Sequence, residues 1–206
     1  MYKLYGSPGS GSASVEAALV ETGVAYRMIV VNTANGEHLA APFSAINPRQ
    51  QVPALVLPDG SVMTEGAAMM LHLADAAPSA GLAPRPGTSE RAQHDRWLIF
   101  MAVNIYEGEL RKAYPERYTT QDDAAPGVAD AADAHVKRQW ILIENAIGGG
   151  PYFFGSDPTM VDLYLWMLAS WMDGDWLAEH CPKAFALAAR IRQRPLVAPV
   201  HHAHFN

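Results

Sequence analysis

Apolar positions recur with two different periods along the chain, and the change of period separates a mixed first part from a helical second part. Short apolar runs typical of strands occupy residues 2–5, 26–31, 54–57 and 61–63. Helical spacing lies between the first two runs, from about Ser12 to Thr22, and Gly23 stands where a helix commonly ends. This strand–helix–strand order predicts a parallel first pair. Another helix is expected from Thr64 to about Ala76.

Beyond residue 77 the apolar spacing is helical throughout. Residues 78–87 are rich in proline and glycine, which indicates a linker. Helices are expected from about Ser89 toward Tyr114, over residues 127–147, from Thr159 onward, and finally over residues 182–194. Thr159 and Asp162 have the spacing of a capping box. The predicted architecture is an α+β domain over residues 1–77, followed by an all-α domain over residues 88–206.

Composition narrows the possible functions. The 206 residues carry 21 acidic and 15 basic side chains, a net charge of −6, and the basic residues form no stripe, which argues against nucleic-acid binding. No uncharged apolar run has the length of a membrane-spanning helix. The single cysteine, Cys181, excludes an internal disulfide. Together with the lack of an apolar leader, it favours an intracellular, cytoplasmic protein.

Two segments carry the candidate chemistry. The first, residues 6–12, follows the first strand, is rich in glycine and serine, and is termed the serine loop below. The second is the turn at Val52-Pro53, where proline stands at the first residue of a strand. A sharp turn at an X-Pro bond leaves the N–H and C=O of Val52 free to pair with a peptide-like ligand. Taken alone, this stretch favours an ordinary turn; its neighbours change that interpretation.

Four local patterns, in their order along the chain, resemble those of the cytosolic glutathione transferases. They are Tyr5-Gly6-Ser7-Pro8-Gly9-Ser10, Gly36-Glu37-His38, the run from Asn47-Pro48 to Gln51-Val52-Pro53-Ala54-Leu55, and Thr64-Glu65-Gly66. The resemblance covers essentially the whole chain and is nearest to serine-type transferases of the plant phi kind and their bacterial relatives. It implies a thioredoxin-like first domain that binds glutathione, a helical second domain that forms the pocket for an electrophile, and a homodimer.

The resemblance also implies how the γ-glutamyl and cysteinyl parts of glutathione bind. Val52, held by Pro53, would pair with the cysteinyl backbone. Glu65 would bind the γ-glutamyl ammonium, and the amide of Gly66, at a helix start, would bind its carboxylate. The family usually has serine or threonine where this chain has Gly66, so one hydroxyl donor is missing, a loss of about 0.5–1.5 kcal/mol.

Two further residues match the glycyl end of glutathione. Gln51 matches a side chain that contacts this end, and its alternative is a solvated loop amide. His38 matches a histidine near the glycyl carboxylate, with an ordinary surface histidine as the equal alternative. Leu39 replaces the lysine that follows in the family pattern, so one cation is absent.

The chemistry requires a thiolate, and a hydroxyl aimed at the sulfur would lower the pKa of the thiol. Ser10, two residues after Pro8 as in the serine-type pattern, is the candidate; Ser12 is its rival and Ser7 a lesser one. If the loop is instead aligned on the bacterial pattern that has a catalytic cysteine, Gly11 takes the position of that cysteine. Ser12 can instead cap the following helix. The absence of cysteine from the loop argues against thiol–disulfide exchange.

The electrophile pocket is expected among aromatic residues of the helical domain, namely Tyr106, Tyr114 and Trp171, although aromatic residues at helical spacing commonly belong to a core. No metal site is expected, because no cysteine or acid frames the terminal histidines, residues 201–204, which are interpreted as a solvated tail.

The predicted function is conjugation of the glutathione thiolate to an apolar electrophile. Alternatives are other glutathione-dependent chemistry, as in an isomerase, dehalogenase or peroxidase, and a non-catalytic carrier or assembly module of the same fold.

Overall fold

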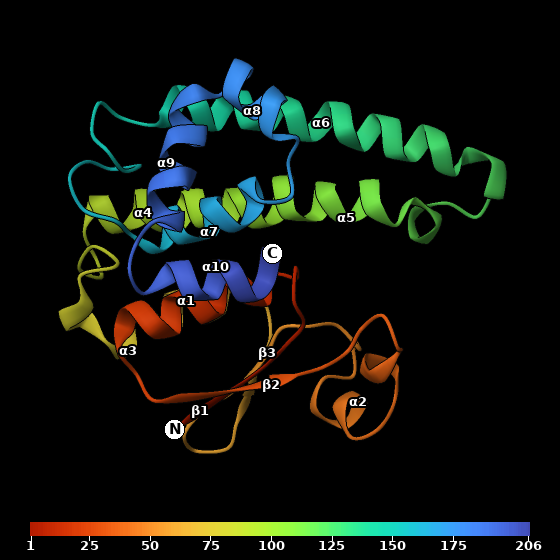
Figure 1. The fold of residues 1–206 in the computed structure, drawn as a ribbon, viewed down its shortest axis with the longest axis horizontal. Helices are drawn as coiled ribbons and strands as arrows, with labels where there is room; N and C mark the ends of the chain where they lie inside the picture. The colour runs from red at the N-terminus through yellow and green to blue at the C-terminus, as the bar shows by residue number, and fades with distance from the viewer. The chain divides into compact units, whose positions relative to one another are not determined.

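The computed structural model describes residues 1–206, apart from the side chain of Asp122. The internal contacts divide the chain into two compact units (Figure 1). The sheet unit comprises Met1–Thr88 and Arg190–Asn206, and the helical unit comprises Ser89–Ala189. The α+β architecture followed by helices is therefore confirmed. Residues 190–206, which the sequence assigned to the helical domain, group with the sheet unit instead.

The sheet unit is built on four strands in the order β2-β1-β3-β4. The strands are β1 (Tyr2–Gly6), β2 (Tyr26–Val30), β3 (Ala54–Val56) and β4 (Val62–Met63). The β1–β2 pair is parallel, as predicted, and the β1–β3 and β3–β4 pairs are antiparallel. Tyr5 lies opposite Ala54 in the β1–β3 pair. This register brings the chain that leaves β1, the serine loop, beside the chain that enters β3, the Val52-Pro53 turn.

Helices cover this sheet. They are α1 (Ser12–Thr22), α2 (Phe43–Ile46), α3 (Gly66–Ala76) and α10 (Val197–Phe205), with short 3-10 turns η1 (Glu37–Leu39) and η2 (Pro78–Ala80). In Figure 1, α1, α3 and α10 lie together on one side of the strands. The apolar positions of α1, including Val15 and Leu19, are fully buried there. Gly23 ends α1 in the left-handed conformation, φ 69°, as its position predicted.

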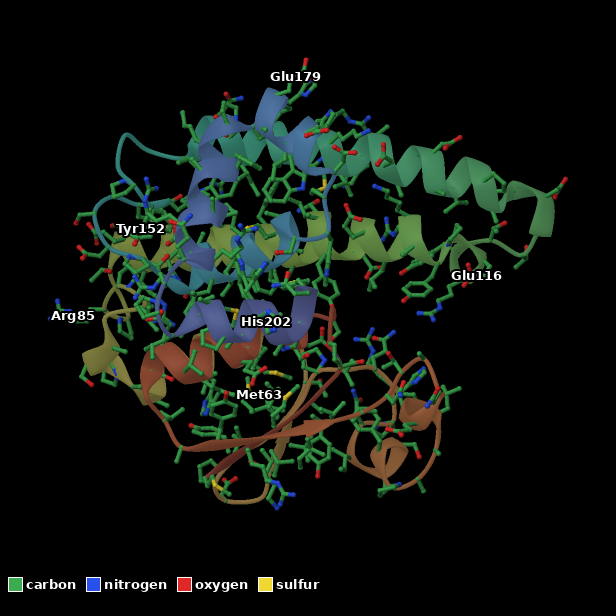
Figure 2. All side chains as sticks on the ribbon, viewed as in Figure 1. Met63, Arg85, Glu116, Tyr152, Glu179 and His202 are labelled. Atoms are coloured by element: carbon green, nitrogen blue, oxygen red, sulfur yellow. The ribbon has the colours of Figure 1, made fainter. Side chains whose placement is uncertain are left out.

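The end of the chain corrects the sequence interpretation, because the terminal histidines belong to a helix and not to a solvated tail. In α10, which carries the labelled His202 in Figure 2, His204 is buried and its Nε2 lies 2.8 Å from Glu16 Oε2 on α1. Arg194 donates two hydrogen bonds of 2.7 Å to the carboxylate of Glu21. These partners lie at opposite ends of the sequence, so no local pattern could reveal them.

The helical unit contains one long interrupted helix and several that pack on it. Its elements are α4 (Ser89–Phe100), the π-helical turns η3 (Met101–Tyr106), α5 (Glu107–Ala113), η4 (Pro115–Tyr118), η5 (Asp122–Ala124), α6 (Ala125–Ala146), α7 (Met160–Ala169) and α8 (Gly174–His180), while α9 (Pro182–Arg192) crosses the unit boundary. The predicted helix from Ser89 toward Tyr114 is present, with a π-helical middle that the sequence did not indicate. The sequence also missed α8 and α10.

The core of the helical unit is centred on α7, as its apolar sequence predicted. Every residue from Met160 to Leu168 is buried. The capping box is present: the side chain of Thr159 accepts from the backbone at Asp162, and the Asp162 carboxylate accepts from the N–H of Thr159 at 2.7 Å. In the loop before α7, where Figure 2 labels Tyr152, the N–H of Phe153 donates to the same carboxylate at 2.7 Å.

Candidate functional site

The serine loop forms a compact hydroxyl network at the start of α1. The Ser10 hydroxyl donates to the carbonyl of Ser7 at 2.7 Å and lies 2.8 Å from Ser12 Oγ. The Ser12 hydroxyl donates to the same carbonyl at 3.1 Å. Ser10 Oγ also accepts the N–H of Ser12 at 3.2 Å. Two hydroxyls thus share one carbonyl acceptor, so one of their protons can turn to another acceptor without leaving that carbonyl unpaired.

Burial separates the two candidate serines. Ser12 is fully buried, and a Cβ added to Gly6 would overlap its side chain, so its hydroxyl faces the interior of the loop. Ser10 is only half-buried. The interpretation of Ser12 as the cap of α1 is wrong: Ser12 is the first residue of the helix, and Ser10 Oγ accepts its N–H. Ser7 is also buried, with its hydroxyl 3.2 Å from Thr33 Oγ1.

The carboxyl end of α10 lies near this loop within the sheet unit. The carbonyl oxygen of His204 lies 3.7 Å from the position that a Cβ on Gly9 would occupy, and Gly9 has a positive φ of 71°. Only glycine adopts this conformation at no steric cost. The loop that carries Ser10 therefore lies close to the end of α10, the segment interpreted from the sequence as a solvated tail.

The Val52 turn has the form that the sequence predicted. The Val52–Pro53 peptide is cis, and the β1–β3 ladder begins only at Ala54. The Val52 side chain packs on an apolar cluster that includes Phe43. Among hydrogen bonds between described residues, none involves the N–H or C=O of Val52. Asn47, which the sequence did not single out, braces the turn: it is 3% exposed and donates to the carbonyl of Gln51 at 2.6 Å.

Glu65 and Gly66 form the amino end of α3. Glu65 has φ 66° and ψ 102°, a backbone conformation that non-glycine residues adopt rarely and mostly at functional sites. The first intrahelical bond runs from Met69 N–H to the Glu65 carbonyl. The amides of Gly66 and the next two residues are therefore outside the helical ladder and suit an anion. The Glu65 carboxylate contacts Arg49 at 2.8 Å; both side chains are more than half exposed.

His38 and Gln51 lie in the same unit but are held differently. His38 belongs to the 3-10 turn η1, and its Nδ1 atom is enclosed without a hydrogen-bond partner in the described chain. The Gln51 side chain is exposed. Leu39, in the position of the missing lysine, is 57% exposed. An exposed leucine beside a histidine gives this edge less positive charge than the family pattern implies.

Of the three aromatic residues expected to line the electrophile pocket, the structure brings two together. Tyr106 packs edge-on against Trp171, with ring centroids 5.1 Å apart, and lies 6.4 Å from the parallel ring of Tyr164. Tyr114 is 42% exposed, and the Arg117 guanidinium lies 4.0 Å from its ring centroid. Tyr106 and Trp171 thus form an aromatic pair in the helical unit, and whether they line a pocket stays a prediction.

Cys181 is a packing residue. It is fully buried, and burial raises the pKa of its thiol to about 11, so little thiolate forms at neutral pH. No group of three metal-ligating side chains occurs among the described residues. No helix in the described chain is long and apolar enough to cross a membrane.

Comparison with known proteins decides the family. The family model of the glutathione S-transferase N-terminal domain matches residues 12–76, and that of the C-terminal domain matches residues 122–196. The chain belongs to the glutathione S-transferase family. Its sheet unit is the thioredoxin-like domain of that family, and the resemblance seen in the sequence is confirmed.

Relatives of this family match the chain over nearly its full length. An uncharacterized GST-like protein of Escherichia coli K12, YncG, is 31% identical over 202 residues, 97% of each chain. The glutathione S-transferase GstA of E. coli O157:H7 is 28% identical over 201 residues, 95% of this chain and 94% of that protein. The crystal structure of a glutathione transferase homologue from Sulfitobacter with bound glutathione has a TM-score of 0.91 at 29% identity, covering 100% of this chain and 99% of the other.

Proposed function

We propose that the chain is a glutathione transferase that binds glutathione in the sheet unit and joins the glutathione sulfur to an electrophilic carbon. The family and the relatives solved with glutathione support this ligand. The observation that carries the proposal is a convergence of three elements. The β1–β3 register sets the serine loop beside the Val52 turn, and the Arg49–Glu65 ion pair joins that turn to the amino end of α3.

The unpaired groups of these elements match the parts of glutathione. The N–H and C=O of Val52 would pair with the cysteinyl backbone as an added strand does. The open amides at the start of α3, Gly66 first, would bind the γ-glutamyl carboxylate. Glu65 would bind the ammonium in place of Arg49, because an exposed ion pair contributes only about 0–1 kcal/mol and is easily exchanged. Gln51 and His38 would contact the glycyl end.

Ser10 would stabilise the thiolate. Its hydroxyl proton can turn from the Ser7 carbonyl toward the sulfur, since the Ser12 hydroxyl keeps that carbonyl paired. Ser12 is then a positioning residue. The thiol proton passes to solvent, the carbon–sulfur bond forms, and the carbon–halogen bond breaks with its electron pair leaving on the halide. With an epoxide, the opened oxygen takes a proton.

The electrophile, which is mainly apolar, would pack on Tyr106 and Trp171. The homodimer and the cytoplasmic location stay predictions.

The first test is calorimetric titration with glutathione, followed by thiolate absorbance against pH. Binding at about one site per chain is expected. Ser10→Ala should raise the pKa of the bound thiol by about 1–2, since a hydrogen bond to a charged group contributes about 1.5–3 kcal/mol. Ser12→Ala should have a smaller effect on that pKa. The reverse ranking would transfer the role to Ser12.

A non-catalytic carrier of the same fold is the second candidate, and Gly66 and exposed Leu39 favour it because both replace a polar group expected at the ligand. Glutathione binding without turnover of any aryl halide would support this candidate. Absence of glutathione binding would remove the transferase proposal altogether.

A further inference from the structure

Glu109 is a buried carboxyl in the helical unit with no role in the chemistry above. It lies in α5 and is 9% exposed. Its Oε1 atom is enclosed and has no hydrogen-bond donor among the described residues, whereas Oε2 is not enclosed in this way. Buried carboxyl groups normally have partners, because a hydrogen bond left unmade there costs free energy. The Glu109 carboxyl therefore has an acceptor position for which the described chain supplies no donor.

The nearest cation does not fill this gap. Lys112, one turn further along α5, binds Asp133 Oδ1 at 2.7 Å, and Asp133 Oδ2 binds Lys137 at 2.7 Å. Burial raises the pKa of the Glu109 carboxyl; Lys112 opposes this and Asp133 adds to it. Glu109 thus lies beside a closed lysine–aspartate–lysine network without belonging to it.

An aromatic pair, Tyr106 with Trp171, lies near this carboxyl by helix geometry. Tyr106 precedes Glu109 by three positions, the spacing of neighbours on one helix face. The Tyr106 ring packs on Trp171, and both side chains are half-buried. Burial lowers the pKa of Lys112, but neighbouring carboxylates, Asp173 among them, outweigh this and raise it. Along the chain, Glu109 stands three positions after Tyr106 and three before Lys112, so the three side chains share one face of the helix.

We propose that Glu109 determines specificity for the second substrate, an aromatic electrophile that carries a protonated amine. This inference rests on the proposed function. The aromatic body would pack on Tyr106 and Trp171, and the ammonium would donate a charge-assisted hydrogen bond to the Glu109 carboxylate. The adjacent rings also attract a cation. A wholly apolar substrate would cover the carboxyl without supplying a donor, and an anionic one would meet like charge.

A matched series of aryl halides tests this specificity. The compounds share ring and leaving group and differ at one remote position, which carries aminomethyl, methyl or carboxylate. Each kcat/KM is divided by the rate constant of the uncatalysed reaction with glutathione, to remove differences in intrinsic reactivity. The aminomethyl compound should exceed the methyl compound by about tenfold or more. Glu109→Gln should abolish this preference, whereas Glu107→Gln, the same charge change on the opposite side of α5, should retain it.

A binding measurement separates this inference from the proposed function. Analogues without the halide cannot react, so their affinities are measured by calorimetry whether or not the chain conjugates glutathione. The aminomethyl analogue should bind the wild-type chain more tightly than the methyl analogue, and Glu109→Gln should remove the difference. Equal binding of the two analogues to the wild type, or a preference that survives Glu109→Gln, overturns the role of Glu109. Loss of glutathione binding alone would overturn only the transferase proposal.

Discussion

Asp162 and Glu109 are two buried carboxyl groups of the helical unit in contrasting surroundings. Burial raises the pKa of both. Asp162 accepts from the N–H of Phe153 at 2.7 Å and from the N–H and hydroxyl of Thr159 at 2.7 and 2.8 Å. Glu109 has an enclosed oxygen that no described residue pairs. A buried acid with filled acceptor positions holds the chain in place, whereas one short of donors suits a ligand.

The largest loss of stability is expected at Asp162, the carboxylate whose acceptor positions are filled. Asp162→Ala removes the carboxylate half of the capping box and leaves two buried N–H groups and one hydroxyl without an acceptor. A destabilisation of about 3–5 kcal/mol is expected from the lost cap and the unpaired donors. Chemical denaturation of the wild type and of the Asp162→Ala variant measures this difference in the free energy of unfolding. Asp162→Asn keeps one acceptor oxygen and should lose less; an Asp162→Ala chain as stable as the wild type would contradict the structural role.

This contrast also shows what the sequence can predict. The capping box was predicted because both partners lie within one helical turn, and the α1 end at Gly23 was predicted for the same reason. The state of Glu109 depends on its burial and on Asp133, which only the packing of α6 against α5 brings near. A glutamate at that position resembles any charged helix residue, so no pattern in the sequence reveals its burial.

A third carboxyl, that of the half-buried Glu16 in the sheet unit, resembles that of Asp162 in having both oxygens paired, and it predicts an intermediate effect. Its two oxygens contact Tyr26 OH at 2.9 Å and His204 Nε2 at 2.8 Å. His204→Ala should cost about 1–3 kcal/mol, the value of a hydrogen bond to a charged group together with an unpaired buried acceptor. Thermal unfolding measures the loss. His202→Ala, on the exposed side of the same helix, is the control, and an equal effect of both would show that α10 contributes only bulk packing.

The proposed glutathione site shows the same limit of sequence reasoning. The order of local patterns was sufficient to predict the Val52 turn and the family, since each pattern is a few residues long. The ranking of the serines required the structure, because the Ser12 hydroxyl is enclosed beneath Gly6 and shares the Ser7 carbonyl with Ser10. The closeness of the His204 carbonyl to the serine loop relates the two ends of the chain, and no local pattern in the sequence predicts it.

The smallest effect on stability, and one of opposite sign, belongs to Glu109→Gln. The folded-state pKa of Glu109 lies above its ordinary value of 4.5, so its contribution to folding is complete below that value and is lost as pH rises through the raised pKa. At neutral pH the glutamine variant, which buries no charge, should equal or exceed the wild type, by on the order of 1 kcal/mol or less. The difference should disappear at acid pH.

Unfolding temperatures of the wild type and of Glu109→Gln, measured from neutral to acid pH, test this difference in stability, and Glu107→Gln is the control. A clear loss of stability at neutral pH would mean that the enclosed oxygen has a partner in solution, and Glu109 would then be an acid of the same kind as Asp162.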